Sequence, residues 1–210
     1  MKFNELFRMI TKTPLFNSKW LLAGSDAAPI YRQLDRWVKD GKIVQLKRGW
    51  YLLSEPYRNE LPHPYFIANQ LKPASYISLQ SALEYYGMIP EYVPVVTSVT
   101  TGRPESVITE IGHFSYTHIK KTFFHSFHTI EITSRESVFM ASPEKALLDL
   151  VYLTPRADTI EYLDELRLQN LINISRKRLK EIATISGSKK LERVVSQINK
   201  MIPNQNEKKE

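Results

Sequence analysis

The sequence predicts an α+β protein: a small N-terminal helix–hairpin unit, then a mixed α/β domain with a mostly antiparallel sheet, then a C-terminal helical segment. Three observations lead to this fold class. The first 53 residues combine helical periodicity with a short hairpin pattern. Residues 93–141 hold several short runs rich in β-branched residues, which favour strands. From Ser142 onward, apolar residues recur at helical spacing.

The N-terminal unit is predicted to begin with a helix over residues 2–11. Its apolar side chains form one stripe, made of Phe3, Leu6, Phe7 and Ile10. Asn17 or Ser18 can cap a second, short helix, and Gly24 stands where that helix should stop. The two helices together predict a small core of their own.

A third helix is expected after Ser25 and Asp26, both of which are N-cap residues. One of its faces is apolar and consists of Ile30, Leu34, Trp37 and Val38. The opposite face carries Tyr31, Arg32, Asp35, Arg36 and Lys39. Gly41 is a left-handed stop for this helix, so the helix is amphipathic, with a mainly cationic outer face.

A β-hairpin follows directly. Ile43, Val44 and Leu46 lead into a turn at Lys47–Gly49, and residues 50–53 lead out. Two helices, a tight turn and a hairpin are typical of a winged helix-turn-helix. Three prolines between residues 54 and 64 indicate a linker. We therefore expect two domains, over residues 1–56 and 64–203.

The charge distribution favours nucleic acid as the partner of the first domain. The formal net charge is +7, and residues 1–60 hold eleven lysines and arginines against six acids. A local positive field attracts phosphate backbones. The candidate DNA-binding residues are Lys19, Ala27, Tyr31, Arg32, Arg36, Lys39, Lys47 and Arg48.

Within this set the expected roles differ. Arg32 and Arg36 lie four residues apart on one helix face, and arginine can make paired hydrogen bonds to guanine. Lys47 and Arg48 can neutralise phosphates from the hairpin turn. The alternative interpretation is a protein-interaction module, because the same helix–hairpin unit also serves in protein–protein contacts.

The second domain is predicted from alternating short elements. Expected helices cover residues 65–71 and 79–86, the second capped by Ser78 and ended by Gly87. Expected strands cover residues 93–101, 107–110, 113–119, 129–133 and 137–141. Ser142 and Pro143 open a strong helix, followed by helical segments near residues 159–171, 175–185 and 188–201.

Several functions are disfavoured. The chain has no cysteine, so it has neither disulfides nor a thiolate nucleophile. No apolar run reaches the roughly 18 residues of a membrane span, and the start does not resemble a signal peptide, so we expect no membrane association and a cytoplasmic protein. The histidines at 113, 118, 125 and 128 do not match a compact zinc-ligand spacing. The Gly-Ser-Asp run at 24–26 lacks the acid pair that a nucleotidyltransferase needs.

Three segments of the second domain resemble a known family. They are SYISLQSALEYYGMIPEYVPVVTSVTTGR at 75–103, FSYTHI at 114–119 and SPEKALLDLVYL at 142–153. Together with QLDRWVKDGKIVQLKRGWYLL at 33–53, they are similar to the AbiEi-type antitoxin family of bacterial transcriptional regulators, from abortive-infection, type IV toxin–antitoxin systems.

The resemblance implies a non-enzymatic DNA-binding repressor without cofactor or metal. It would occupy double-stranded repeats in its own promoter and oppose a nucleotidyltransferase-like toxin through its C-terminal domain. Stand-alone relatives without a toxin partner leave a transcription regulator as the alternative. The family-motif residues are Ser78, Glu84, Thr97, Ser98, Thr100, Tyr116, Glu144, Lys145 and Asp149. We expect Lys145 and Asp149, four apart on one helix, to form a surface pair.

Overall fold

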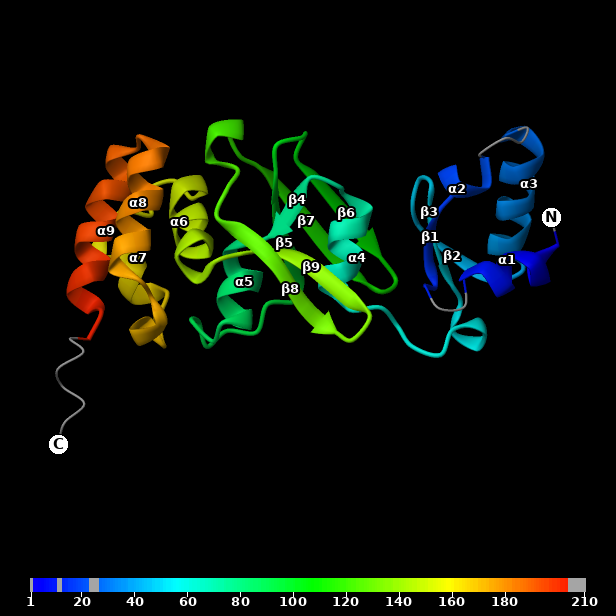
Figure 1. The fold of residues 1–210 in the computed structure, drawn as a ribbon, viewed down its shortest axis with the longest axis horizontal. Coiled ribbons are helices and arrows are strands. Elements are labelled where there is room, and N and C mark those ends of the chain that lie inside the picture. The colour runs from blue at the N-terminus through cyan, green and yellow to red at the C-terminus, as the bar shows by residue number, and fades with distance from the viewer. Residues whose placement is uncertain (1, 11–12, 23–26, 204–210) are drawn as a thin grey trace.

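The computed structural model describes residues 2–10, 13–22 and 27–203. The molecule is elongated and has three parts along its longest axis (Figure 1). A small N-terminal unit lies at one end, a six-stranded mixed sheet lies in the middle, and a group of C-terminal helices lies at the other end. The fold is α+β, as the sequence predicts.

The N-terminal unit alternates helices with short strands. Its elements are α1 (Phe3–Ile10), β1 (Leu15–Asn17), α2 (Lys19–Leu22), α3 (Ala27–Lys39), β2 (Ile43–Lys47) and β3 (Trp50–Leu53). The strands form an antiparallel sheet in the order β1-β3-β2. The predicted first helix, third helix and hairpin are therefore confirmed, while Gly24, Ser25 and Asp26 lie outside the described residues.

Local signals place the ends of these elements. The Asn17 side chain accepts a hydrogen bond from the Lys19 amide at 2.9 Å, at the start of α2. Gly41 ends α3 with φ +67°, and Gly49 turns the hairpin with φ +82°. A residue with a Cβ would be strained at both positions, so the two glycines determine where the helix stops and where the chain reverses.

The N-terminal sheet is apolar on both faces. One face packs under the helices in a small core that includes Phe16, Tyr51 and Leu53. The other face contributes Leu46 and Leu52, which are buried, to the larger core of the rest of the molecule. The sheet is therefore a layer between the N-terminal helices and the second domain.

The second domain begins after a linker that contains a short 3₁₀ turn at Glu55–Tyr57. Its elements are α4 (Pro64–Leu71), β4 (Ser75–Ile77), α5 (Leu79–Tyr85), β5 (Val95–Thr100), β6 (Glu105–Thr109), β7 (Gly112–His118), β8 (Phe127–Thr133) and β9 (Glu136–Ala141). A second 3₁₀ turn, Lys121–Phe123, precedes β8.

The strand order of this sheet is β6-β7-β5-β4-β9-β8. The β5–β7 and β4–β9 pairs are parallel, and the other three pairs are antiparallel. The sheet is mixed: most of its pairs are antiparallel, as predicted, but the two parallel pairs were not foreseen. In this sheet the parallel pairs join strands that are not consecutive in the sequence, which requires a crossover connection. The composition of a strand does not indicate which strand it will pair with.

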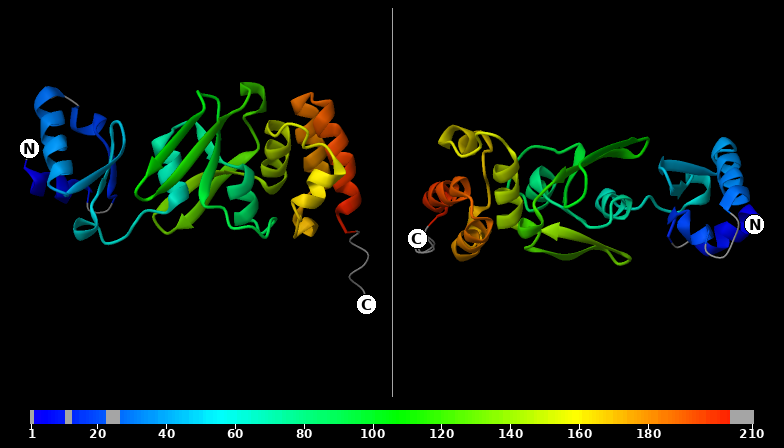
Figure 2. Two further views of the ribbon diagram at one scale, coloured as in Figure 1. Left: turned by 180° about the vertical axis from the view of Figure 1, so that it is seen from behind. Right: turned by 90° about the horizontal axis from the view of Figure 1, so that it is seen from above.

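The C-terminal part comprises α6 (Pro143–Leu153), α7 (Ile160–Glu165), a 3₁₀ turn (Leu171–Asn173), α8 (Arg176–Ser186) and α9 (Lys189–Met201). Ser142 caps α6 by accepting a hydrogen bond from the Lys145 amide. Helix α6 lies between α5 and the α8–α9 pair (Figure 2), which explains why it is buried on nearly all sides. No helix in the described ranges is long and apolar enough to cross a membrane.

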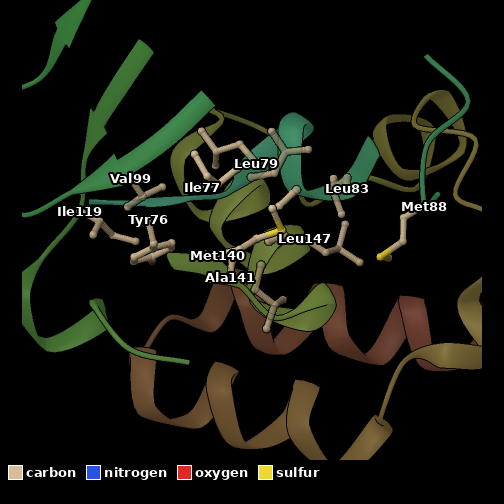
Figure 3. Packing of buried hydrophobic residues seen from close by; sticks show 14 of the residues in the cluster. Tyr76, Ile77, Leu79, Leu83, Met88, Val99, Ile119, Met140, Ala141 and Leu147 are labelled. Carbon is tan, nitrogen blue, oxygen red and sulfur yellow. The ribbon is translucent and has the colours of Figure 1, made fainter. Parts of the chain in front are cut away.

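The main core gathers side chains from three layers (Figure 3). Ile77 on β4 and Met140 on β9 lie close to Leu83 on α5 and Leu147 on α6. All four are buried. This core holds the sheet against α5 and α6 and thereby determines where the motif residues point.

Candidate nucleic-acid interface and a buried polar network

The outer face of α3 is the candidate nucleic-acid interface. Arg32, Arg36 and Lys39 are exposed on it, while Leu34 and Trp37 on the opposite face are buried. Predicted site residues Ala27 and Tyr31 are also exposed at the start of this face. The helix thus presents cationic groups and one aromatic ring to solvent, as its periodicity predicts.

The cations on α3 form no ion pair with any acid in the described ranges. In the described part of the chain, no carboxylate lies within ion-pair distance of Arg32, Arg36 or Lys39. Arg32 makes one long contact, from Nε to the Ala28 carbonyl at 3.4 Å. Asp35 lies on the same exposed face, and its negative charge opposes any phosphate that approaches.

Two further candidates lie beside the hairpin turn. The Ser18 amide donates a hydrogen bond to the Gly49 carbonyl at 2.8 Å, which holds the turn against the start of α2. Lys19 and Arg48, the residues next to this bond, are both exposed. The fold therefore brings together two cations that are 29 positions apart in the sequence.

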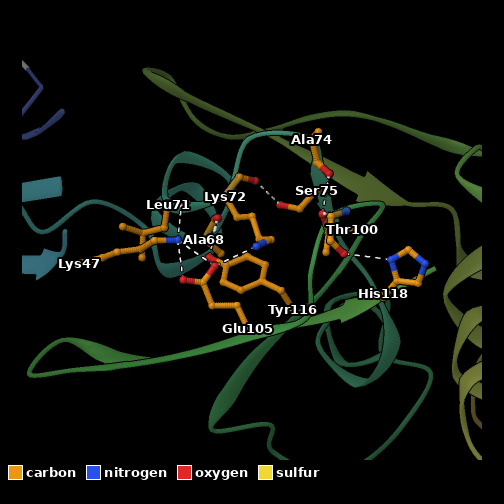
Figure 4. Close-up of polar contacts among 11 residues, drawn as sticks. Lys47, Ala68, Leu71, Lys72, Ala74, Ser75, Thr100, Glu105, Tyr116 and His118 are labelled. Carbon is orange, nitrogen blue, oxygen red and sulfur yellow. Dashed lines mark hydrogen bonds and ion pairs between the residues drawn. The ribbon is translucent and has the colours of Figure 1, made fainter. Parts of the chain in front are cut away.

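Lys47 behaves differently from the rest of the predicted set. Its Nζ lies 2.7 Å from Oε1 of Glu105 on β6 and 3.4 Å from the carbonyl of Leu71 (Figure 4). Lys72 binds the other carboxylate oxygen at 2.8 Å. In this structure Lys47 contacts the second domain, which sequence reasoning did not foresee because Glu105 lies 58 residues away.

The motif residues of the second domain lie mainly in its interior. Asp149 accepts hydrogen bonds from the Tyr76 hydroxyl at 2.9 Å, from the Ser78 hydroxyl at 2.8 Å and from the Lys145 ammonium. Lys145 and Asp149 are both fully buried. The predicted pairing is confirmed, but its predicted place on the surface is wrong, because α6 is covered on the side that carries these residues.

The electrostatics of this pair follow from its burial. Burial raises the pKa of Asp149 and lowers the pKa of Lys145, and the attraction between the two groups opposes both shifts. The Lys145 ammonium also lies 3.8 Å from the centroid of the Phe123 ring, a cation–π contact. Ser78 directs its hydroxyl to Asp149, so it does not cap α5 with its side chain as predicted.

The remaining motif side chains mostly join one backbone segment to another. Thr97 Oγ1 donates to the Ser78 carbonyl at 2.7 Å, Thr100 Oγ1 to Ala74 O at 3.1 Å, and Tyr116 Oη to Ala68 O at 2.8 Å. Glu84 accepts from the Val93 amide and Glu144 from the Ser175 amide. Ser98 is buried, and its hydroxyl has no hydrogen-bond partner among the residues that the structure describes.

Because of these hydrogen bonds, most of the motif residues have a structural role. Sequence reasoning missed Tyr76 and Ser81, which complete the network through Asp149 and through Thr97. A tyrosine in an apolar strand and a serine in a helix carry no local signal of such partners, since the partners come from distant segments.

The described residues contain no group of three or more histidine, cysteine or acidic side chains placed to hold a metal. His113 contacts Ser106, His118 contacts the Gly102 carbonyl and His125 contacts Ser126. The histidines are therefore spread over separate partners.

A hollow of about 470 Å³ lies beside α5 and β7. Tyr65, Tyr85 and Tyr92 contribute to its lining, together with Glu84 and His113. Tyr92 is 82% exposed. Its tyrosines form an aromatic surface on the second domain. This surface is separate from the cationic face of α3.

Comparisons with known proteins inform the fold. No protein-family model and no curated protein matches the chain. Among solved structures, the RV2827C protein from Mycobacterium tuberculosis is similar, with a TM-score of 0.58 at 14% sequence identity. The match covers 93% of this chain and 75% of that one. At this identity the likeness supports the α+β arrangement and carries no function.

Proposed function

We propose that the chain is a DNA-binding transcriptional repressor that reads duplex DNA through a winged helix-turn-helix at its N-terminus. The observation that carries the proposal is the exposed cationic face of α3, together with the exposed cations Lys19 and Arg48 at the hairpin turn. The element order helix, strand, helix, helix and hairpin around a three-stranded sheet supports the winged-helix interpretation.

In the proposed complex, α3 enters the major groove with its first turns toward the base edges. Arg32 and Arg36 donate paired hydrogen bonds to guanine, and Tyr31 packs against the bases. Lys19, Lys39 and Arg48 contact phosphates and set the register of the helix on the duplex. Base contacts then carry sequence preference, and phosphate contacts carry most of the salt-dependent affinity.

The test is fluorescence anisotropy with a duplex taken from upstream of the chain's own gene, against a shuffled duplex of equal length. Arg32→Ala or Arg36→Ala should cost about 1–3 kcal/mol on the cognate duplex and less on the shuffled one. Lys177→Ala removes one exposed positive charge from α8 and is the control. Equal binding of both duplexes, or equal losses in the control, would refute base reading by α3.

The antitoxin part of the proposal rests on the resemblance of the second domain and on its exposed aromatic surface. Tyrosine is enriched in protein interfaces, and Tyr85 and Tyr92 are exposed at the rim of the 470 Å³ hollow. We place contact with a nucleotidyltransferase-like toxin here. The test is co-expression with a nucleotidyltransferase-like toxin gene taken from beside the chain's own gene, where Tyr92→Ala should reduce both rescue of growth and co-purification. Unchanged rescue would exclude this surface.

A further inference from the structure

Glu105 joins two lysines that come from different parts of the molecule. Lys47 belongs to the hairpin of the N-terminal unit, and Lys72 follows α4 in the second domain. The three side chains are 26%, 16% and 30% exposed for Lys47, Lys72 and Glu105. They are partly shielded from water, so their attraction is stronger than that of a fully exposed pair.

The site lies at the rim of an apolar contact between the two domains. Leu46, the residue before Lys47, is buried in the core of the second domain, as are Leu15 and Leu52. Strand β2 lies beside β6, which carries Glu105. The apolar contact brings the hairpin against the second domain, and the carboxylate lies where the hairpin turn begins.

Lys47 is therefore positioned for two mutually exclusive uses. It immediately precedes Arg48, the exposed cation of the turn. An ammonium that donates to both Glu105 and the Leu71 carbonyl (Figure 4) is engaged and not free for a phosphate. A duplex that reached the turn would have to compete with Glu105 for the same charge.

We propose that Glu105 is a positioning residue that holds the hairpin on the second domain and withholds the charge of Lys47 from DNA. Lys72 keeps the carboxylate in place from the side of the second domain. This inference rests on the proposed DNA-binding function and deepens it: the second domain regulates how many phosphates the reader neutralises.

The first test is the salt dependence of DNA affinity, because each phosphate neutralised on duplex DNA adds about 0.9 to the slope of log K against log salt. Glu105→Gln releases Lys47. Its slope should therefore be steeper than that of the wild type by about 0.9, which is roughly a 3.5-fold greater loss of affinity between 50 and 200 mM salt.

Three further variants make this result specific. The double variant Lys47→Met with Glu105→Gln should return to the wild-type slope, because the released charge is gone. Glu105→Asp keeps the carboxylate and should keep the wild-type slope. Lys72→Met removes one of the two lysines that bind Glu105 and should steepen the slope by less than Glu105→Gln does, because the carboxylate itself remains to engage Lys47. A wild-type slope in Glu105→Gln, or a steeper slope that persists without Lys47, would overturn the proposal.

A second readout needs no DNA and separates the failure of this inference from failure of the proposed function. Arg58 in the linker donates to the Leu53 carbonyl at 2.7 Å, so loosening of the hairpin should expose it to trypsin. We expect faster cleavage at Arg58 in Glu105→Gln and in Lys47→Met than in the wild type, at matched thermal stability. If the wild type binds no duplex but these variants are cleaved faster, the proposed DNA binding is refuted, while the positioning of the hairpin by Glu105 is supported. If cleavage is unchanged in both variants, Glu105 does not position the hairpin.

Discussion

The buried pair of Lys145 and Asp149 allows a quantitative prediction about stability. Asp149→Asn keeps the shape of the side chain and an oxygen that can accept from Tyr76 or Ser78. It removes the negative charge and leaves the Lys145 ammonium buried beside the Phe123 ring. The substitution thus isolates the cost of one uncompensated charge in the interior.

The magnitude follows from the burial. Breaking a buried ion pair by removing one partner typically costs about 3–5 kcal/mol, and both side chains here are fully buried. For a protein of this size each kcal/mol lowers Tm by about 2–4 °C. We therefore expect Tm to fall by roughly 6–20 °C in Asp149→Asn.

The assay is thermal and urea unfolding at neutral pH, with two controls. Adding Lys145→Met to Asp149→Asn should recover most of the loss, because the charge that lacks a partner is then gone. Glu181→Gln breaks the exposed pair with Lys177, which has the same four-residue spacing on α8, and should change stability by less than about 0.5 kcal/mol. A loss below about 1 kcal/mol in Asp149→Asn, or a double variant less stable than the single one, would refute this account of the pair.

Further predictions concern the N-terminal core, the reader helix and the contact at Glu105. Leu34→Ala removes a fully buried side chain and should cost about 2–5 kcal/mol in urea unfolding, whereas Met9→Ala, at a 65% exposed position, should cost almost nothing. Asp35→Asn removes a negative charge from the outer face of α3 and should tighten binding to any duplex by a few-fold, measured by anisotropy at low salt; weaker binding would place that face away from DNA. For Glu105, burial raises the pKa, but hydrogen bonds and charge from Lys47 and Lys72 outweigh it and hold the pKa below the ordinary 4.5. A lowered folded-state pKa gives stability that is present above pH 4.5 and is lost as pH falls through the folded-state pKa. The difference in urea stability between wild type and Glu105→Gln should therefore shrink as pH falls below 4.5. A difference that grows toward acid would contradict the sign.

The N-terminal elements could be predicted because their signals are local. The apolar face of α3, its stop at Gly41 and the turn at Gly49 depend on residues within a few positions of one another. Exposure of Arg32 and Arg36 follows from the same periodicity. The cap of α6 at Ser142 is equally local, and it too was predicted correctly.

The sequence by itself thus determined the helices and hairpin of the N-terminal unit, the class of the fold and the cationic face of α3, because these depend on spacing along the chain. Only the tertiary structure decided the mixed sheet order, the burial of Lys145 and Asp149, and the engagement of Lys47 by Glu105. Each of these depends on which distant segment covers a given face, and a lysine on an amphipathic helix or at the end of a strand has the same local pattern whether its partner is water or a carboxylate. Long-range packing supplies that partner, and with it the difference between a surface charge and a structural one.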